Sequence, residues 1–194
     1  MYGNEEAADA LAEVIRKLQP QLGRPVRVLE IGAGGNVPPE IMLRRLIGEL
    51  GVKPSSLEYH YQDLDKQPVL GQKFGVAVRR LPAADAATKE GLAALRKNGP
   101  YDVVLTVNVK TLAGAAEDPF SRDKNAEASA KKAVAGMHAN SYELLHPHGI
   151  MLDIFHHDEE CDYTPPSKHQ WIHEEPERIG EYSIRAYRKK AARL

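Results

Sequence analysis

The sequence lacks several features that would place it in well-known classes of protein. Of its 194 residues only Cys161 is a cysteine, so no disulfide can form within the chain and we expect a reducing, intracellular setting. The N-terminal residues have no apolar signal core, and no apolar run is long enough to span a bilayer. The formal net charge is −1, which gives no overall field toward nucleic acids or anionic membranes. We therefore expect a cytoplasmic protein with no membrane partner.

Hydrophobic patterning indicates alternating strands and helices. Short apolar, β-branched runs predict strands at residues 26–31, 56–61, 76–81, 101–107 and 150–155. Apolar residues at helical spacing predict helices at residues 5–18, 38–50, 87–95 and 123–145. Pro20 and Gly23 are expected to end the first helix, and Gly51 the second. About ten residues, 66–75, link the second and third strands, so any crossover helix there is abbreviated.

This alternation predicts an α/β fold. Parallel neighbours need crossover connections, so we expect a doubly wound, mostly parallel seven-stranded sheet with helices on both faces. The end of the chain differs, because residues 169–173 and 182–188 have strand patterns with no helix between them. They predict an antiparallel hairpin at the C-terminal edge, packed by Trp171, the only tryptophan. No repeat or linker divides residues 1–194, so a single domain is expected.

A glycine-rich turn follows the first predicted strand. Such a turn lets the backbone approach a ligand closely, beside the free N–H groups of the next helix. A dinucleotide fingerprint needs glycine at the first, third and sixth positions; Gly32 and Gly34 fit, but Val37 stands at the sixth. The turn therefore indicates a nucleotide-like ligand and disfavours NAD.

The stretch from Val28 to Asn36 resembles the first motif of the class I, Rossmann-like S-adenosylmethionine-dependent methyltransferases: an acidic residue, Glu30, precedes glycines at alternate positions. Asn36 stands where a third glycine is common. The later motifs occur in the family's order. Asp63, followed by Leu64, matches the acidic residue that takes the ribose hydroxyls, with Asp65 as the nearby alternative. Residues 144–152 resemble the family's turn into strand five, with His148 replacing a glycine.

The resemblance implies a transferase with S-adenosylmethionine as cofactor and an oxygen or nitrogen acceptor. Asp85 and Ala86 resemble the element that meets the adenine ring, although Asp85 could equally be a helix N-cap. The implied cofactor-binding residues are Glu30, Gly32, Ala33, Gly34, Asp63, Leu64, Asp85, Ala86 and Asn108. Residues 1–22 are then a leading helix, residues 24–155 the cofactor-binding core, and residues 156–194 the acceptor-side loop and hairpin.

A cluster of ionisable side chains begins directly after the fifth predicted strand. Ligands of open α/β sheets bind at the carboxyl ends of the strands, so His156 or His157 could act as the catalytic base. The alternative is a solvated polar loop. Cys161, His169 and His173 match no zinc motif, and no metal site is expected.

The sequence leaves the acceptor and the partners open. It offers no inserted lid, so the acceptor is expected to be a small molecule or an exposed group on a larger one, and a homodimer could supply a missing wall. Nucleic acid is disfavoured by the charge, although a C-terminal basic patch keeps it open: Arg185, Arg188, Lys189, Lys190 and Arg193. Two other functions remain, a non-catalytic regulatory subunit that binds the cofactor and, less favoured, an NAD-dependent oxidoreductase.

Overall fold

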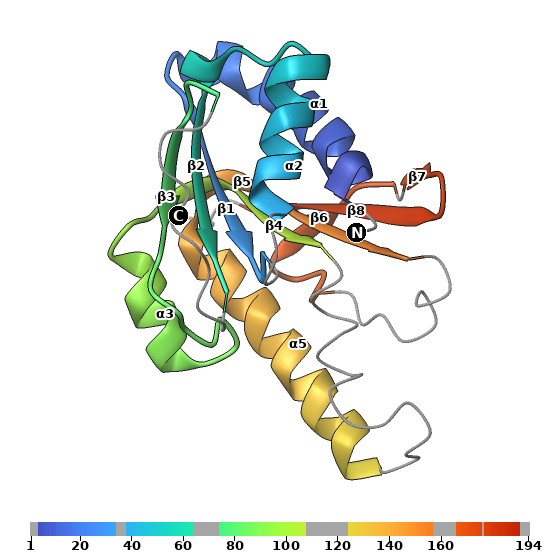
Figure 1. The fold of residues 1–194 in the computed structure, drawn as a ribbon. Helices are drawn as coiled ribbons and strands as arrows, with labels where there is room; N and C mark the ends of the chain where they lie inside the picture. Colours follow the sequence, from blue (N-terminus) through green and yellow to red (C-terminus); the bar gives the residue numbers. More distant parts are fainter. Residues whose placement is uncertain are drawn as a thin grey trace.

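One mixed sheet runs through the computed structural model, which describes residues 4–33, 38–63, 74–107, 124–156, 166–175 and 177–190 (Figure 1). Within those ranges the order of its strands is β3-β2-β1-β4-β5-β8-β6, and β7 also pairs with β8. Strands β1 to β5 are parallel neighbours, whereas β8 runs antiparallel to β5, β6 and β7. The strands are β1 (Val26–Ile31), β2 (Leu57–Gln62), β3 (Ala77–Arg80), β4 (Tyr101–Val107), β5 (Leu145–His156), β6 (Trp171–His173), β7 (Glu177–Ile179) and β8 (Tyr182–Lys189).

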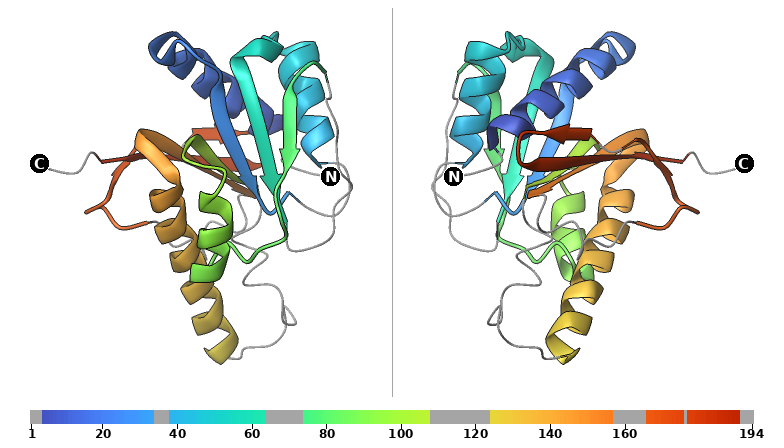
Figure 2. Two further views of the ribbon diagram at one scale, coloured as in Figure 1. Left: turned by 90° about the vertical axis from the view of Figure 1, so that its left-hand side faces the viewer. Right: turned by 90° about the vertical axis from the view of Figure 1, so that its right-hand side faces the viewer.

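Helices cover both faces of this sheet, and Figure 2 shows the two layers from opposite sides. Helix α1 (Asn4–Leu22) and helix α2 (Pro38–Leu43), which continues into the π-helical turn η1 (Arg44–Glu49), pack over one hydrophobic core. Helices α3 (Lys89–Arg96) and α5 (Lys124–Leu144) pack over the other. A short 3-10 turn, η2 (Pro54–Ser56), leads into β2. The expected doubly wound α/β fold is confirmed, but the described residues form eight strands and not the seven predicted, because the short strand β7 also pairs with β8.

The first helix is longer than predicted. Proline removes one helical hydrogen bond, but Pro20 lies in the last turn, so α1 continues through it to Leu22. Gly23 then adopts a left-handed φ of +63° and donates its N–H to the Gln19 carbonyl at 3.1 Å. Glycine, and not proline, therefore ends this helix.

The C-terminal hairpin forms at the predicted edge, with two differences in detail. The first strand begins at Trp171, because residues 168–170 form a turn. The short strand β7 lies in the connection, for which the sequence predicted only that it has no helix. The Trp171 ring is buried and meets Tyr142 edge-on at 5.3 Å between centroids. This tryptophan packs the hairpin, as predicted.

The turn into β5 is a wide irregularity in the β4–β5 ladder. Leu145 pairs with Tyr101, and Ile150 pairs with Val103, so residues 146–149 face a single residue of β4. His148 adopts a left-handed φ of +65°, and a Cβ on Gly149 would lie 2.9 Å from a Leu145 side-chain carbon. The segment that resembles the family turn is therefore a tight, glycine-dependent bend.

The amino ends of the central strands are joined by ion pairs. Arg24 holds Asp102 through two hydrogen bonds of 2.7 and 2.8 Å, and Arg27 pairs with Glu58 at 3.0 Å. These charges are used within the fold, at the end of the sheet opposite the glycine turn. No helix in the described ranges is long and apolar enough to cross a bilayer.

Candidate functional site

The glycine turn after β1 is fastened to the end of β2. Gly32 and Ala33 both donate their backbone N–H groups to the Gln62 carbonyl, at 2.8 and 3.1 Å. Gly32 has a φ of +72°, a conformation that side chains with a Cβ rarely adopt. The turn therefore starts with a fixed backbone shape, and Gly34 lies outside the described residues.

Glu30 lies just before this turn in β1, and its side chain faces the interior. It is 1% exposed, and its Oε2 accepts a hydrogen bond of 2.6 Å from the Tyr59 hydroxyl, which also lies 3.1 Å from Met42 Sδ. Burial raises the pKa of Glu30 to about 7, the charge of Asp63 adds to the rise, and the Tyr59 hydrogen bond opposes it. Glu30 therefore links β1 to Tyr59 of β2, and a direct cofactor contact from it stays a prediction.

Asp63 follows β2 at the same end of the sheet. It is half-buried and directly follows Gln62, whose carbonyl accepts the hydrogen bonds from Gly32 and Ala33. Its neighbour Leu64 lies outside the described residues. Asp63 thus stands beside the glycine turn, as a residue that contacts the same ligand must.

Gln62 joins these two segments to a third, and the sequence reasoning missed it. Its buried side-chain amide donates to the Ala84 carbonyl, in the turn that contains Asp85 and Ala86. The backbone and side chain of this one residue therefore bring together the glycine turn, Asp63 and the 84–86 turn. A glutamine at a strand end carries no sequence signature, so only the register of β1 with β2 could have indicated it.

The 84–86 turn has its own internal order. The Asp85 carboxylate accepts a hydrogen bond of 2.9 Å from the Ala87 N–H, and the Asp85 carbonyl accepts from the Thr88 N–H and hydroxyl. Thr88 is the N-cap of α3 and accepts from the Gly91 N–H at 3.1 Å, so the N-cap alternative for Asp85 is wrong. Within the part of the chain that the structure describes, no hydrogen bond occupies the Ala86 N–H.

Both helices of this layer press closely on the same turn. A Cβ on Gly91 of α3 would lie 1.8 Å from the Asp85 carbonyl oxygen, and one on Gly136 of α5 would lie 2.4 Å from that of Ala87. Asn140 of α5 donates to the Ala86 and Thr88 carbonyls, each at 2.8 Å. The turn is therefore held from behind, which leaves its outer side for a ligand.

The predicted acceptor side is described only in part. The backbone of His156 ends β5 opposite Tyr182, but its side chain, His157 and Asn108 lie outside the described residues. His169 lies in the turn before β6, and His173 Nε2 lies 3.0 Å from the Pro166 carbonyl. Among the described residues no group of histidine, cysteine and acidic side chains is arranged to hold a metal ion, and Cys161 falls outside them.

Three buried polar side chains meet near this side, and the sequence reasoning missed them as well. Thr106 of β4 donates to Asp153 Oδ1 of β5 at 2.7 Å, and His138 Nε2 of α5 lies 3.3 Å from Asp153 Oδ2. Asp153 is 1% exposed, Thr106 2% and His138 5%. A carboxylate is costly to bury, and here it has a hydrogen-bond donor on each oxygen.

The C-terminal basic patch is largely used inside the fold. Lys189 Nζ donates to the Tyr142 and Leu145 carbonyls at the end of α5, at 2.7 and 2.8 Å, and burial lowers its pKa. Arg188 pairs with Glu174 at 2.8 Å, and Lys190 donates to the Lys168 carbonyl. These cations bind carbonyl and carboxylate groups of the protein itself, which weakens the case for a nucleic-acid surface here.

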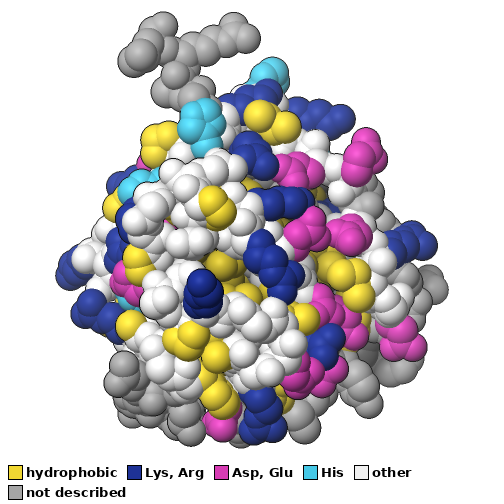
Figure 3. Space-filling view, turned by 90° about the horizontal axis from the view of Figure 1, so that it is seen from above, with side chains coloured by type: hydrophobic (Ala, Val, Ile, Leu, Met, Phe, Trp, Pro, Cys, Tyr) yellow, Lys and Arg dark blue, Asp and Glu magenta, His cyan; other side chains and the backbone are white. Residues whose placement is uncertain are grey.

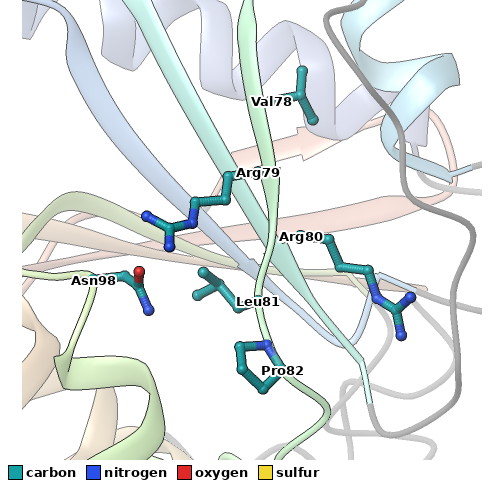
Figure 4. A pocket seen from close by; sticks show the side chains of 6 residues that line it. All are labelled: Val78, Arg79, Arg80, Leu81, Pro82 and Asn98. Atoms are coloured by element: carbon teal, nitrogen blue, oxygen red, sulfur yellow. The ribbon is translucent and has the colours of Figure 1, made fainter.

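A groove of about 490 Å³ lies away from the glycine turn, along the outer strand β3. Arg79 and Asn98 lie on one side of this strand and Arg80 on the other (Figure 4). Leu81 and Pro82, which lead toward the 84–86 turn, complete its lining together with Val78. The groove therefore lies next to the 84–86 turn but is separate from the candidate site, and Asp63 is not among its lining residues.

Comparison with known proteins identifies the fold. No family model matches the chain, and no curated protein matches its sequence. Among solved structures, a proposed class I S-adenosylmethionine-dependent methyltransferase from Listeria monocytogenes matches with a TM-score of 0.58 and 14% identity, over 96% of this chain and 60% of that one. A TehB-like S-adenosylmethionine-dependent methyltransferase from Corynebacterium glutamicum matches with a TM-score of 0.53 and 15% identity, over 98% of this chain and 89% of that one.

A third match was solved with ligands. It is the 1,6-didemethyltoxoflavin-N1-methyltransferase of Burkholderia thailandensis with bound 1,6-didemethyltoxoflavin and S-adenosylhomocysteine. It has a TM-score of 0.52 and 18% identity, and the match covers 96% of this chain and 80% of that one. At such identities the likeness concerns the fold: this chain has the fold of the class I S-adenosylmethionine-dependent methyltransferases.

Proposed function

We propose that this protein is an S-adenosylmethionine-dependent methyltransferase that acts on an oxygen or nitrogen acceptor. The observation that carries the proposal is the convergence on Gln62, which brings the glycine turn, Asp63 and the 84–86 turn to one end of the sheet. The resemblance assigns these same segments to one cofactor. The fold of the chain supports the same ligand.

The donors and acceptors in these segments fit the parts of S-adenosylmethionine. The Asp63 carboxylate would accept hydrogen bonds from the ribose hydroxyls, and Asp85 one from the adenine amino group. The Ala86 N–H would donate to a ring nitrogen, while Gly32, Ala33 and Gly34 would let the backbone approach closely. Leu64 and Asn108 would complete the site, as the resemblance implies. The cofactor would supply an electrophilic methyl group on a sulfonium.

Methyl transfer asks little of the protein beyond alignment. The chain must hold donor and acceptor in line, keep water away and, for some acceptors, remove a proton. His156 or His157 remains our sequence-based prediction for a base. The acceptor would be a small molecule or an exposed group on a larger one, and a second subunit could cover it.

The surface charge disfavours a nucleic-acid substrate. The net charge of the chain is −1, and on the face shown in Figure 3, which lies at the amino ends of the central strands and away from the glycine turn, basic and acidic side chains are interspersed. A phosphate backbone is usually met by a field of one sign. A protein or small-molecule acceptor therefore fits the net charge of the chain better.

Calorimetry tests the cofactor. We expect binding of S-adenosylmethionine and S-adenosylhomocysteine and none of NAD, which would also separate this function from an NAD-dependent oxidoreductase. Replacing Asp63→Asn should weaken both interactions about tenfold to a hundredfold, because hydrogen bonds to a charged acceptor are lost. Glu174→Gln, on the hairpin, should bind like the wild type. Absence of binding to either adenosyl compound would refute the proposal.

An acceptor screen tests the reaction. Radiolabelled S-adenosylmethionine is incubated with the protein and fractionated small molecules and proteins, and at a limiting cofactor concentration transfer should be slower with Asp63→Asn than with the wild type. Binding without transfer to any fraction would favour the regulatory-subunit alternative.

A further inference from the structure

One cation of the groove beside β3 is not used within the described part of the fold. Arg79 is exposed, and among the described residues its guanidinium forms no hydrogen bond and no ion pair. Two other arginines at the amino end of the sheet do form such pairs, since Arg24 binds Asp102 and Arg27 binds Glu58. Arg79 therefore presents an uncompensated charge to a groove of about 490 Å³.

The carboxylate nearest along the neighbouring strand is already occupied. Arg79 is the register partner of His60 in β2, and Glu58 lies two residues before His60, so all three belong to one face of the sheet. Glu58 accepts hydrogen bonds of 3.0 and 3.2 Å from Arg27, and its Oε1 lies 3.0 Å from His60 Nε2. His60 Nδ1 lies 3.0 Å from the Tyr101 hydroxyl. This network is complete without Arg79.

A fixed turn carries the second polar group of the groove. Asn98 follows α3 and is half-buried; its backbone N–H donates to the Leu95 carbonyl at 3.1 Å, and its carbonyl accepts from Arg27 at 2.8 Å. Its side-chain amide has no hydrogen-bond partner in the described ranges. Figure 4 shows Arg79 and Asn98 on the same side of β3. Two donors without protein partners therefore line the same side of the groove.

These donors fit a carboxylate. A guanidinium and a primary amide both present N–H groups in a plane, and a carboxylate has two oxygens that accept them. The single unpartnered guanidinium on this side balances one negative charge, whereas a phosphate group carries about two. Leu81 and Pro82 give the groove an apolar wall beside the donors. The lining is therefore matched to one carboxylate attached to an apolar body.

Protection of the outer strand explains only part of this arrangement. A charged side chain on such a strand discourages pairing with a second copy of the chain. That role is met by Arg79 alone and gives no reason for an unpartnered amide on the turn that faces the same groove. A ligand that accepts from both side chains accounts for both.

We propose that the groove beside β3 binds a small carboxylic acid with an aliphatic or aromatic body, its carboxylate lying between Arg79 and Asn98. The volume of about 490 Å³ is within the range of small-molecule sites, roughly 300–1,000 Å³. The body of the acid would contact Leu81 and Pro82. This site is separate from the proposed cofactor site, so the inference does not depend on the methyltransferase function.

NMR of the nitrogen-15-labelled protein tests the chemistry of the ligand, with phenylacetate as the probe. We expect phenylacetate to shift the backbone amide signals of residues 78–81 and 97–99, with a Kd on the order of 1 mM. Phenylacetamide has the same body without the charge and should bind about tenfold more weakly. Inorganic phosphate should also bind more weakly than phenylacetate. Equal binding of the amide, tighter binding of phosphate, or shifts confined to other residues would overturn the inference.

Two variants test the assigned residues. Arg79→Gln should weaken phenylacetate binding about tenfold, because the charge is lost. Asn98→Asp should weaken it at least as much, because the new carboxylate competes for Arg79 and repels the ligand. Arg44→Gln is the matched control, since Arg44 is an exposed arginine of η1 over the other core, and it should bind like the wild type. Wild-type affinity in Arg79→Gln would refute the site.

An acidic protein segment is the other source of a carboxylate. Acetylated tetraglutamate at physiological salt tests it, because this peptide has several carboxylates and no apolar body. We expect it to bind more weakly than phenylacetate. Tighter binding, with shifts that extend beyond the groove, would assign this surface to a protein partner, and the small-acid inference would be wrong.

Saturating S-adenosylhomocysteine distinguishes this site from the cofactor site. The phenylacetate shifts should persist in its presence. Their loss would mean that the groove takes the carboxylate of the adenosyl compound itself, and the inference of a separate site would be overturned. If neither adenosyl compound binds but phenylacetate does, the methyltransferase function is wrong and the groove site stands.

Discussion

Glu30 lies in β1 just before the glycine turn; its carboxyl group accepts a hydrogen bond from the Tyr59 hydroxyl, and burial raises its pKa to about 7. A buried carboxyl with a raised pKa favours its neutral form, so ionisation works against folding. Its contribution to stability is fully present below the ordinary value of 4.5 and is lost as the pH rises through about 7. The same pH interval covers the conditions in which most enzymes are assayed.

We therefore expect Glu30→Gln to flatten the pH dependence of stability. Between about pH 5 and pH 8 the wild type should lose roughly 2 kcal/mol more unfolding free energy than the variant, which has no proton to release at this position. Urea denaturation at a series of pH values measures the difference between the two proteins, so that the titrations of His60 and His146 cancel. Parallel curves for the two proteins would show that Glu30 does not titrate in this range.

The resemblance indicated Asp63 and Asp85 because each is an acidic residue that follows a strand, in the order in which the family's motifs occur. The resemblance could not indicate Gln62, or the pair of His138 with Asp153, for physical reasons. Gln62 acts through its backbone carbonyl as much as its amide. His138 and Asp153 meet only because α5 folds back over β5, and neither residue type at its own position differs from an ordinary helix or strand residue. Contacts between elements decide such sites.

Among the elements, the turn of residues 84–88 is the one most constrained by its neighbours. Gly91 allows α3 to approach the Asp85 carbonyl, and a Cβ there would lie 1.8 Å from that oxygen. The overlap is with backbone, so the turn itself must move. A displacement of the turn should weaken the binding of any ligand that Asp85 and Ala86 contact.

We expect Gly91→Ala to destabilise the protein by about 1–3 kcal/mol and to weaken S-adenosylhomocysteine binding about tenfold. Gly48→Ala is the matched control, because a Cβ at Gly48 would have no atom of the described residues within 4 Å and alanine favours helix. Thermal unfolding and calorimetry measure both effects. If the two variants had the same stability and the same affinity for S-adenosylhomocysteine, the turn would be able to move without loss of stability and would not determine the shape of the ligand site.

The accuracy with which the bounds of the helices and strands could be predicted depended on the residues at their ends. β1 and β4 begin and end at the predicted residues, since both are apolar runs preceded by proline, at Pro25 and Pro100. α1 passes through Pro20 because a proline in the last turn removes little bonding. The hairpin started late and gained β7, because three-residue strands depend on pairing with β8 and not on their own pattern.

At the scale of the whole molecule, the two ends of the sheet have different roles. Ion pairs such as Arg24 with Asp102 join the amino end, whereas the glycine turn, Asp63 and the 84–86 turn meet at the carboxyl end. A cofactor bound there should alter the local motions of that end alone. The hairpin turns and the groove beside β3 are the natural references, because both are exposed parts of the same fold.

Hydrogen exchange with and without saturating S-adenosylhomocysteine tests this division. We expect the locally exchanging amides of residues 32–33, 63 and 84–88 to slow about tenfold or more, because the ligand covers the turns and opposes their opening. Amides at residues 168–170 and 180–181, which lie in turns of the hairpin region, should exchange as before. Slowing confined to residues 97–99 would instead place the ligand in the groove of Arg79 and Asn98, and the carboxyl-end site would be refuted.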